Sequence, residues 1–367
     1  MIRRRIYILD CFRGIAIIGI VCFHLLSDVA TQYGTIFNNL IQHANYGVQI
    51  FFVISGVSIS YYIQKLNQSQ NSPIILLKRY ILRIYIPHFY ALLFSGIIIP
   101  FLIYAYLEIK GVDSKHIFFT YSMADWIHLF TLTKVFIPYN STFISWRDIW
   151  QPFMPINPPL WYIAVMVQIY IIIFIALLFK AHYLKVIGII TGLSVISLIH
   201  LQYVYFPYGL FLPFWLHFVW GMLLFYLTNH GYVHTLKFII TAGLSLLMGG
   251  IIFLFTIRIS SFLTYSPLIF SLLFGILFWL LYPHDQTLSH LFFLKPFKFI
   301  GKFSYSIYLL HFPLRTLVEV VVKDIVSWPR FIYMPVLVIP LILIISYLWY
   351  QIFERKWTNL TPKIIYE

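Results

Sequence analysis

The sequence predicts an all-α polytopic integral membrane protein, a bundle of about ten transmembrane helices with both termini in the cytoplasm. Of its 367 residues, 61% are hydrophobic and only 10% are charged, and the mean hydropathy is +0.87. A soluble domain carries about 25% charged residues, so this composition excludes a soluble globular protein. The net charge of +14 does not indicate a nucleic-acid partner, because the basic residues cluster at the ends of apolar spans.

Ten apolar stretches are each close to the ~20 residues that a helix needs to cross a bilayer. They are expected at 11–29, 46–64, 84–107, 160–180, 184–201, 209–228, 236–257, 262–282, 303–322 and 331–353. The topology follows from the Lys and Arg residues, because sixteen of them fall in segments on the side of the N-terminus and seven on the other side. We therefore expect one transmembrane domain over 1–360 and a long outer connection, 108–159, with helices that lie at the membrane interface.

The first span contains ionisable residues that are costly in an apolar helix. Asp10 and Arg13 lie near its start, and His24 lies near its end. In a helix, Arg13 and His24 share one face to within about 20° and lie roughly 16 Å apart along the axis. The alternative is a signal anchor with an interfacial arginine and a packed histidine.

Two arginines mark the start of the third span. Arg79 and Arg83 are four residues apart, so they share a helix face at the cytoplasmic mouth of the bundle. Guanidinium groups bind phosphate well through paired hydrogen bonds. The alternative is that both are ordinary basic anchors on the cytoplasmic side.

The ninth span carries a polar stripe. His311, Arg315 and Glu319 follow one another at four-residue spacing, which places them on one face and lets Arg315 pair with Glu319. The stripe must face the bundle interior or a wet cavity, because lipid offers it no partner. A purely structural ion pair is the alternative. No histidine or cysteine cluster has metal-ligand spacing, so no metal is expected.

Five segments in order resemble the membrane-bound acyltransferase-3 family, and the similarity extends over nearly the whole chain. They are Leu9–Ala16 with His24, Gly47–Gly56, Arg79–Pro87, Asn157–Tyr162 with Trp161, and Ser304–Leu314; the ending Phe353–Arg355 is also similar. The resemblance implies a stand-alone ten-helix enzyme of the cell (inner, cytoplasmic) membrane. Such an enzyme moves an acyl group, usually acetyl from acetyl-CoA, onto a hydroxyl of a cell-surface glycan or its lipid-linked precursor.

The resemblance also assigns roles to residues. His24 takes the position of the catalytic histidine, Arg13 that of its paired arginine, and Arg79 and Arg83 those of a second arginine motif on the CoA side. Two departures are visible. The family usually spaces the second pair of arginines by three residues, whereas here the spacing is four. Many members carry a glutamate pair where this chain has Met166 and Val167, so a role for those glutamates is not carried over.

The expected mechanism uses His24 as the general base that takes the acceptor's hydroxyl proton. Asp10 and Arg13 are further catalytic candidates, and either Asp28 or Glu319 could orient the imidazole. The expected partners are an acyl-CoA donor, a glycan or lipid-linked sugar acceptor, and membrane lipids. The sequence leaves open acetyl against succinyl or another short acyl group. A transporter or flippase of a glycan or lipid-linked sugar is the competing class, and a structural subunit is a third.

Overall fold

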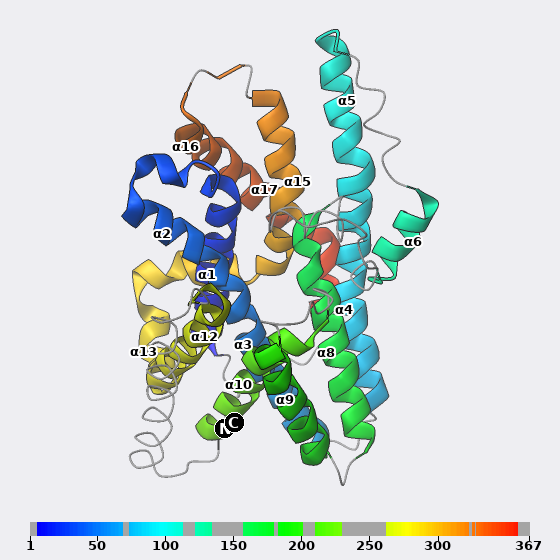
Figure 1. Cartoon of the computed structure of the whole chain (residues 1–367), viewed down its shortest axis with the longest axis vertical. Coiled ribbons are helices and arrows are strands. Elements are labelled where there is room, and N and C mark those ends of the chain that lie inside the picture. Colours follow the sequence, from blue (N-terminus) through cyan, green and yellow to red (C-terminus); the bar gives the residue numbers. More distant parts are fainter. Residues whose placement is uncertain are drawn as a thin grey trace.

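The computed structural model describes residues 6–68, 73–112, 122–133, 157–179, 183–200, 210–229, 262–322, 325–326 and 328–358, and no strand occurs among them (Figure 1). The longer helices are α1 (Tyr7–Leu26), α3 (Gly47–Gln68), α4 (Pro73–Leu93), α5 (Ile99–Ile109), α8 (Trp161–Leu178), α9 (Tyr183–His200), α10 (Leu212–Asn229), α12 (Phe262–Leu281), α15 (Ser304–Val322) and α17 (Ile339–Trp349). The shorter ones are η1 (Ala30–Tyr33), α2 (Thr35–His43), η2 (Ala44–Tyr46), η3 (Phe94–Ile98), α6 (Met123–Phe130), η6 (Pro158–Leu160), η8 (Tyr282–His284), α13 (Asp285–His290), η9 (Phe292–Leu294), α14 (Lys295–Gly301), α16 (Arg330–Tyr333), η10 (Met334–Val338), η11 (Tyr350–Glu354) and α18 (Arg355–Thr358).

Seven helical stretches in this part of the chain are long and apolar enough to cross a membrane. They match seven of the expected spans and are Tyr7–Leu26, Thr35–Leu66, Tyr80–Ile109, Pro158–Leu178, Pro267–His290, Ser304–Val322 and Arg330–Glu354. The expected spans 184–201 and 209–228 correspond to shorter apolar helices, Tyr183–Ser197 and Leu212–Thr228. The span expected at 236–257 lies outside the described residues. The all-helical membrane class is confirmed, while the count of ten and the side of the termini stay predictions.

α1 and α15 run side by side in the same direction (Figure 1). Near the start of α1, the carbonyl of Asp10 lies against Gly301 at the end of α14. Near the end of α1, His24 lies beside His311 of α15. The ten spans expected from the sequence predict the same arrangement, because the first and the ninth span would both begin on the same side of the membrane.

At two of the close helix–helix contacts, a reciprocal pair of glycines lets the backbones touch. A methyl group at Gly14 would overlap the carbonyl of α14 residue Phe297, and one at Gly301 would overlap that of Asp10. Gly56 of α3 and Gly221 of α10 meet in the same reciprocal way. Small residues let membrane helices pack by close van der Waals contact. The α1–α14 contact therefore fixes the backbone that carries Asp10.

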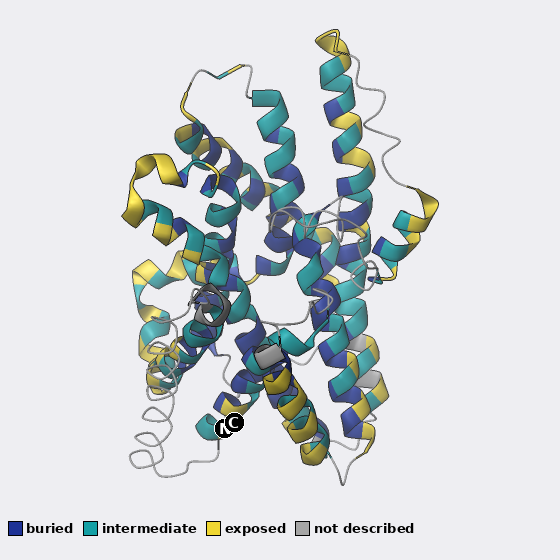
Figure 2. Cartoon of the chain, viewed as in Figure 1, coloured by how far each residue is buried: buried dark blue, intermediate teal, exposed yellow. Residues whose placement is uncertain are grey.

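The outer faces of several helices carry exposed apolar side chains, which suit contact with lipid (Figure 2). Examples are Phe101 on α5, Ile189 and Leu193 on α9, and Ile344 and Leu348 on α17. Polar groups are instead buried between helices. They include Asp10, Ser58, Ser95, Asn157, Ser306, His311 and Glu354. The interior, not the perimeter, therefore holds the groups that can carry chemistry.

One helix, α6, is described within the long connection 108–159, and it begins with a capping box between Ser122 and Asp125. The helix packs against α4. The Tyr85 hydroxyl donates to the carbonyl of Phe130 over 2.7 Å, and the rings of Phe89 and Phe130 lie 5.0 Å apart. The placement of this connection at the outer interface stays a prediction.

Candidate functional site

His24 and His311 lie side by side, although they come from opposite ends of the chain. Their ring centroids are 5.1 Å apart, and the ring of Phe312 packs edge-on against His24 at 5.9 Å. α1 carries His24 in its last turn, and α15 carries His311, which is only 1% exposed. The structure thus brings together two candidate residues whose proximity the sequence does not indicate.

Hydrogen bonds of His311 identify the ring nitrogen that carries its proton. Its Nδ1 lies 2.9 Å from the carbonyl oxygen of Tyr308 and 3.2 Å from that of Ile307. Carbonyl oxygens only accept hydrogen bonds, so Nδ1 is the donor. Nε2 of the neutral ring then holds a lone pair, and it has no hydrogen-bond partner among the described residues. His311 therefore offers a buried acceptor beside His24.

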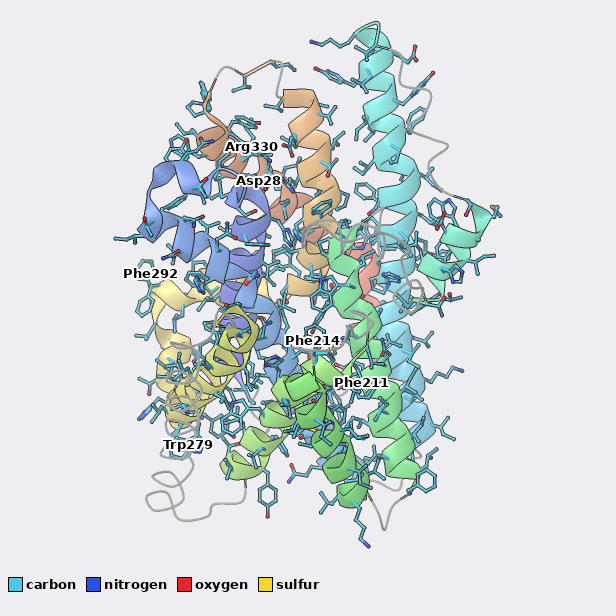
Figure 3. The ribbon with its side chains drawn as sticks, viewed as in Figure 1. Asp28, Phe211, Phe214, Trp279, Phe292 and Arg330 are labelled. Atoms are coloured by element: carbon cyan, nitrogen blue, oxygen red, sulfur yellow. The ribbon has the colours of Figure 1, made fainter. Side chains whose placement is uncertain are left out.

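Two acids and two arginines form an ion network, and Figure 3 labels two of its members, Asp28 and Arg330. Arg315 lies 3.1 Å from Asp28 and 3.6 Å from Glu319. Arg330 lies 3.5 Å from Asp28 and 2.7 Å from Glu319. The structure pairs Arg315 with Glu319, as their spacing predicts. Both carboxylates bind arginines, whereas the ionisable ring that lies beside His24 is that of His311.

Arg13 is held near the opposite end of α1. It lies 3.3 Å from an oxygen of Asp10 and donates to the Ser58 hydroxyl of α3 over 3.1 Å. Asp10 is 2% exposed, and a carboxylate buried at this depth requires a cation at its side. The Arg13 side chain keeps 25% of its surface exposed, and its guanidinium links α1 to α3.

Arg13 and Arg83 converge on the same buried polar residues. Arg83 acts electrostatically on Glu354 and Tyr170, and Arg13 acts on the same two residues. Arg79 lies on α4 together with Arg83, but its side chain falls outside the described part. Arg13 and Arg83, which are far apart in the sequence, thus lie within electrostatic range of the same two residues.

Trp161 begins α8 and packs against Phe214 of α10, with ring centroids 4.9 Å apart. Within the same sequence segment, the buried Asn157 amide donates to the carbonyl of Leu309 over 2.8 Å. Leu309 is two residues before His311 on α15. The Asn157–Tyr162 segment therefore helps to fix the position of α15, the helix that carries the second histidine.

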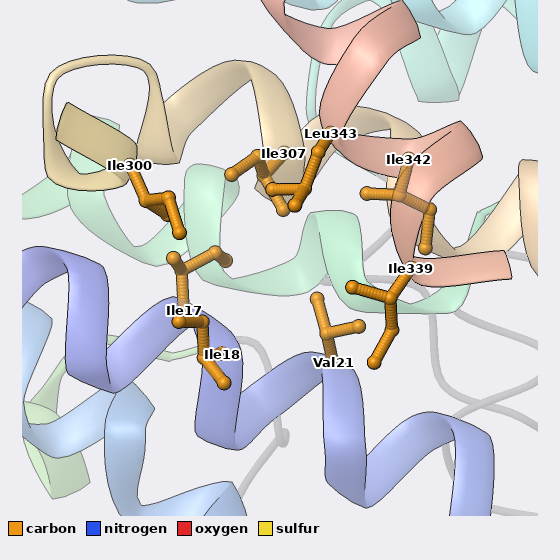
Figure 4. A pocket seen from close by; sticks show the side chains of 8 residues that line it. All are labelled: Ile17, Ile18, Val21, Ile300, Ile307, Ile339, Ile342 and Leu343. Atoms are coloured by element: carbon orange, nitrogen blue, oxygen red, sulfur yellow. The ribbon is translucent and has the colours of Figure 1, made fainter. Parts of the chain in front are cut away.

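An apolar cavity of about 80 Å³ lies between α1, α14, α15 and α17 (Figure 4). Its lining consists of Ile17, Ile18, Val21, Ile300, Ile307, Ile339, Ile342 and Leu343. Val21 precedes His24 by three residues, and Ile307 precedes His311 by four. Because all eight side chains are aliphatic, the cavity supplies no reacting group.

Three residues of this region are absent from the sequence-based candidates. Arg330 completes the ion network, Ser58 binds Arg13, and the buried Glu354 accepts a 2.5 Å hydrogen bond from Ser306. The sequence could have indicated Glu354, because Phe353–Arg355 is one of the segments that carry the family resemblance. The sequence does not indicate the contacts of Ser58 and Arg330, since their partners lie on other helices.

Comparison with known proteins identifies the family. The acyltransferase domain of the acyltransferase-3 family matches residues 6–355, nearly the whole chain. No curated protein and no solved structure matches. The matched region includes both histidines, both arginine motifs and Glu354. The chain therefore belongs to the acyltransferase-3 family and is a membrane acyltransferase.

Proposed function

We propose that this protein is an O-acyltransferase of the cell membrane that takes acetyl from acetyl-CoA on the cytoplasmic side. The acceptor is a hydroxyl of a cell-surface glycan or of its lipid-linked precursor. The observation that supports this proposal most is the pairing of His24 with His311 inside a chain of the acyltransferase-3 family. An imidazole with a free lone pair is the group that acyl transfer to a hydroxyl needs as a base.

In the proposed reaction, His24 removes the proton of the acceptor hydroxyl. The hydroxyl oxygen forms a bond to the thioester carbonyl carbon, the carbon–sulfur bond breaks, and CoA leaves as a thiol after it receives a proton. His311 acts as the positioning residue, because its Nε2 can accept a hydrogen bond from the ring of His24. This replaces Asp28 and Glu319 in that role, since their carboxylates bind Arg315 and Arg330.

The donor would approach along the face of α1 that begins at Arg13. Arg13, Arg83 and Arg79 supply guanidinium groups for the phosphates and carbonyls of CoA. From Arg13 to His24 the helix rises roughly 16 Å, a distance that the extended pantetheine arm can cover. The thioester would then lie at the histidine pair while the phosphates stay at the mouth.

The test is a His24→Ala variant of the full chain, with the acetyl content of surface glycans measured by mass spectrometry. We expect acetylation to fall to the level of the deletion strain. His43→Ala is the matched control, because His43 is an exposed histidine at the end of α2. Normal acetylation by a well-folded His24→Ala protein would refute the proposed mechanism.

A transporter of glycans or lipid-linked sugars is the second candidate, because charged residues follow α1 from Asp10 to the Asp28–Arg315 pair beyond its end. Such a path would also suit a polar cargo. The deletion strain separates the two functions. Loss of acetyl groups from an exported glycan supports transfer, whereas loss of export with unchanged acetylation supports transport.

A further inference from the structure

Pro313 lies inside α15, two residues after His311, and it deprives one backbone carbonyl of this helix of its usual donor. Proline has no N–H, and the carbonyl that this N–H would have bound is the one four residues earlier, which is that of Leu309. An unpaired carbonyl is costly inside a membrane, where no water replaces the lost donor. Leu309 is fully buried, so its carbonyl needs a donor from another part of the chain.

Asn157 supplies this donor. Its amide nitrogen lies 2.8 Å from the carbonyl oxygen of Leu309 and 3.3 Å from the hydroxyl oxygen of Ser95. The carbonyl can only accept, and the Ser95 hydroxyl already donates its proton to the carbonyl of Ala91 over 2.7 Å. Both contacts therefore require the nitrogen of the amide and not its oxygen. The two N–H groups of one fully buried side chain thus link α15 to the turn η3.

The segment that carries Asn157 is stiff, and it is attached to α15 a second time. Pro158 and Pro159 follow directly and begin the turn η6, and the ring of each proline fixes its φ angle. The hydroxyl of Tyr308 donates to the carbonyl of Pro159. Two adjacent residues of α15, Tyr308 and Leu309, are therefore held by one short segment.

The same turn of α15 orients the ring of His311. The carbonyls of Ile307 and Tyr308 accept from Nδ1 of this ring, and Leu309 is the next residue. A rotation of this turn would move the imidazole relative to that of His24, whose centroid is 5.1 Å away.

We propose that Asn157 is a positioning residue for acyl transfer, which keeps the ring of His311 in place beside His24. It does so by binding the backbone carbonyl that Pro313 leaves without a helical donor. Precise placement matters for the rate, because a displacement of about 1 Å can slow a reaction by roughly 100-fold. This inference rests on the proposed function, which makes His24 the base.

The first measurement is the initial rate of label transfer from radiolabelled acetyl-CoA to glycans, in membrane vesicles of the deletion strain that contain each full-length variant. We expect Asn157→Ala to be about tenfold slower or more, with an unchanged KM for acetyl-CoA. Asn157→Asp, which has nearly the same shape but no N–H groups, should be slowed in the same way. Asn39→Ala is the matched control, because Asn39 is an exposed asparagine on α2.

Pro313→Ala separates positioning from a general loss of packing. It restores a backbone N–H that can bind the carbonyl of Leu309, so the amide of Asn157 is no longer needed. We expect Pro313→Ala alone to stay within about threefold of the wild-type rate, since a carbonyl oxygen has two lone pairs and can accept from both donors. The double variant Asn157→Ala/Pro313→Ala should have the rate of Pro313→Ala. A wild-type rate in Asn157→Ala, or a loss that Pro313→Ala does not relieve, overturns the inference.

NMR of the full chain in detergent, with nitrogen-15-labelled histidine, measures the ring itself, and His311→Gln identifies its signals. We expect Asn157→Ala to shift both ring nitrogens of His311 and the double variant to restore them; unchanged shifts overturn the inference. If Asn157→Ala does not fold, Tyr308→Phe, which removes the second attachment, decides by the same two measurements. The NMR experiment needs neither acetyl-CoA nor an acceptor. Absence of label transfer by the wild type therefore refutes the proposed function, while the shifts still test the contact.

Discussion

The imidazole rings of His24 and His311 lie with their centroids 5.1 Å apart, and one of them has a hydrogen-bonding pattern fixed by its own helix. The carbonyls of Ile307 and Tyr308 hold the Nδ1 proton of His311. The opposite nitrogen is consequently an acceptor in a buried, largely apolar region. Two histidines in this arrangement can divide the work, with one moving the proton and the other orienting its partner.

His311 variants test that division of roles. His311→Gln can place an amide oxygen near the former Nε2, whereas His311→Asn can only reproduce the donor at Nδ1. We therefore expect the Asn variant to lose about 100-fold or more in the rate constant of acyl transfer and the Gln variant to lose less. The measurement is single-turnover transfer from radiolabelled acetyl-CoA. Equal rates for both variants and the wild type would contradict a role for Nε2.

The ion network predicts that Asp28, just beyond the end of α1, and Arg330, at the start of α16, contribute to stability together. Asp28 interacts with both Arg315 and Arg330, so a double-mutant cycle of Asp28→Asn and Arg330→Gln should give a coupling free energy of about 1 kcal/mol. High salt should reduce it, because all four side chains are partly exposed. Asp28→Asn combined with Arg355→Ala is the control and should be additive.

The sequence predicts the membrane class and the identity of most charged residues at the site, because burial in lipid selects apolar spans and makes each polar residue conspicuous. It does not predict which polar residues meet. His24 lies beside His311, and Arg13 binds Ser58, because separate spans pack together. The rotation of each helix about its axis determines which of its faces touches a neighbour. The role of Asp28 illustrates this limit, since its spacing from His24 suggests an orienting contact while the structure gives it two arginines.

The start of α1 makes a similar point about capping. Ile6 precedes the helix and provides no side-chain cap. Asp285 of α13 caps the helix instead, because its two carboxylate oxygens accept hydrogen bonds from the backbone N–H groups of Tyr7 and Ile8 at 3.1 and 2.7 Å. No local motif could reveal a cap supplied from a distant part of the chain.

Loss of this distant cap should weaken the packing of α13 against α1. We expect Asp285→Ala to lower the free energy of unfolding by about 1–2 kcal/mol, and Asp285→Asn, which keeps one acceptor oxygen, to lower it less. Chemical denaturation in detergent micelles measures the difference. The neighbouring Gln286 is exposed, so Gln286→Ala should leave the stability unchanged, and an equal loss in that variant would argue against capping.

The contact between Gly301 and the carbonyl of Asp10 predicts a link between packing and the site. A methyl group at position 301 would overlap a backbone atom of α1, and backbone cannot rotate away as a side chain can. We expect Gly301→Ala to cost about 1–3 kcal/mol of stability and to displace Asp10. Because Asp10 lies 3.3 Å from Arg13, the same variant should also weaken CoA binding under the proposed function.

Gly188→Ala is the matched control for Gly301→Ala. Both are glycines in helices, but a methyl group at Gly188 would meet nothing within 4 Å. Replacing an unconstrained helical glycine with alanine stabilises a helix by about 0.5–1 kcal/mol. The two substitutions should therefore change stability in opposite directions, and only Gly301→Ala should change the Kd of CoA. If both variants bound CoA as the wild type does, the α1–α14 contact would be a packing feature that does not influence Arg13.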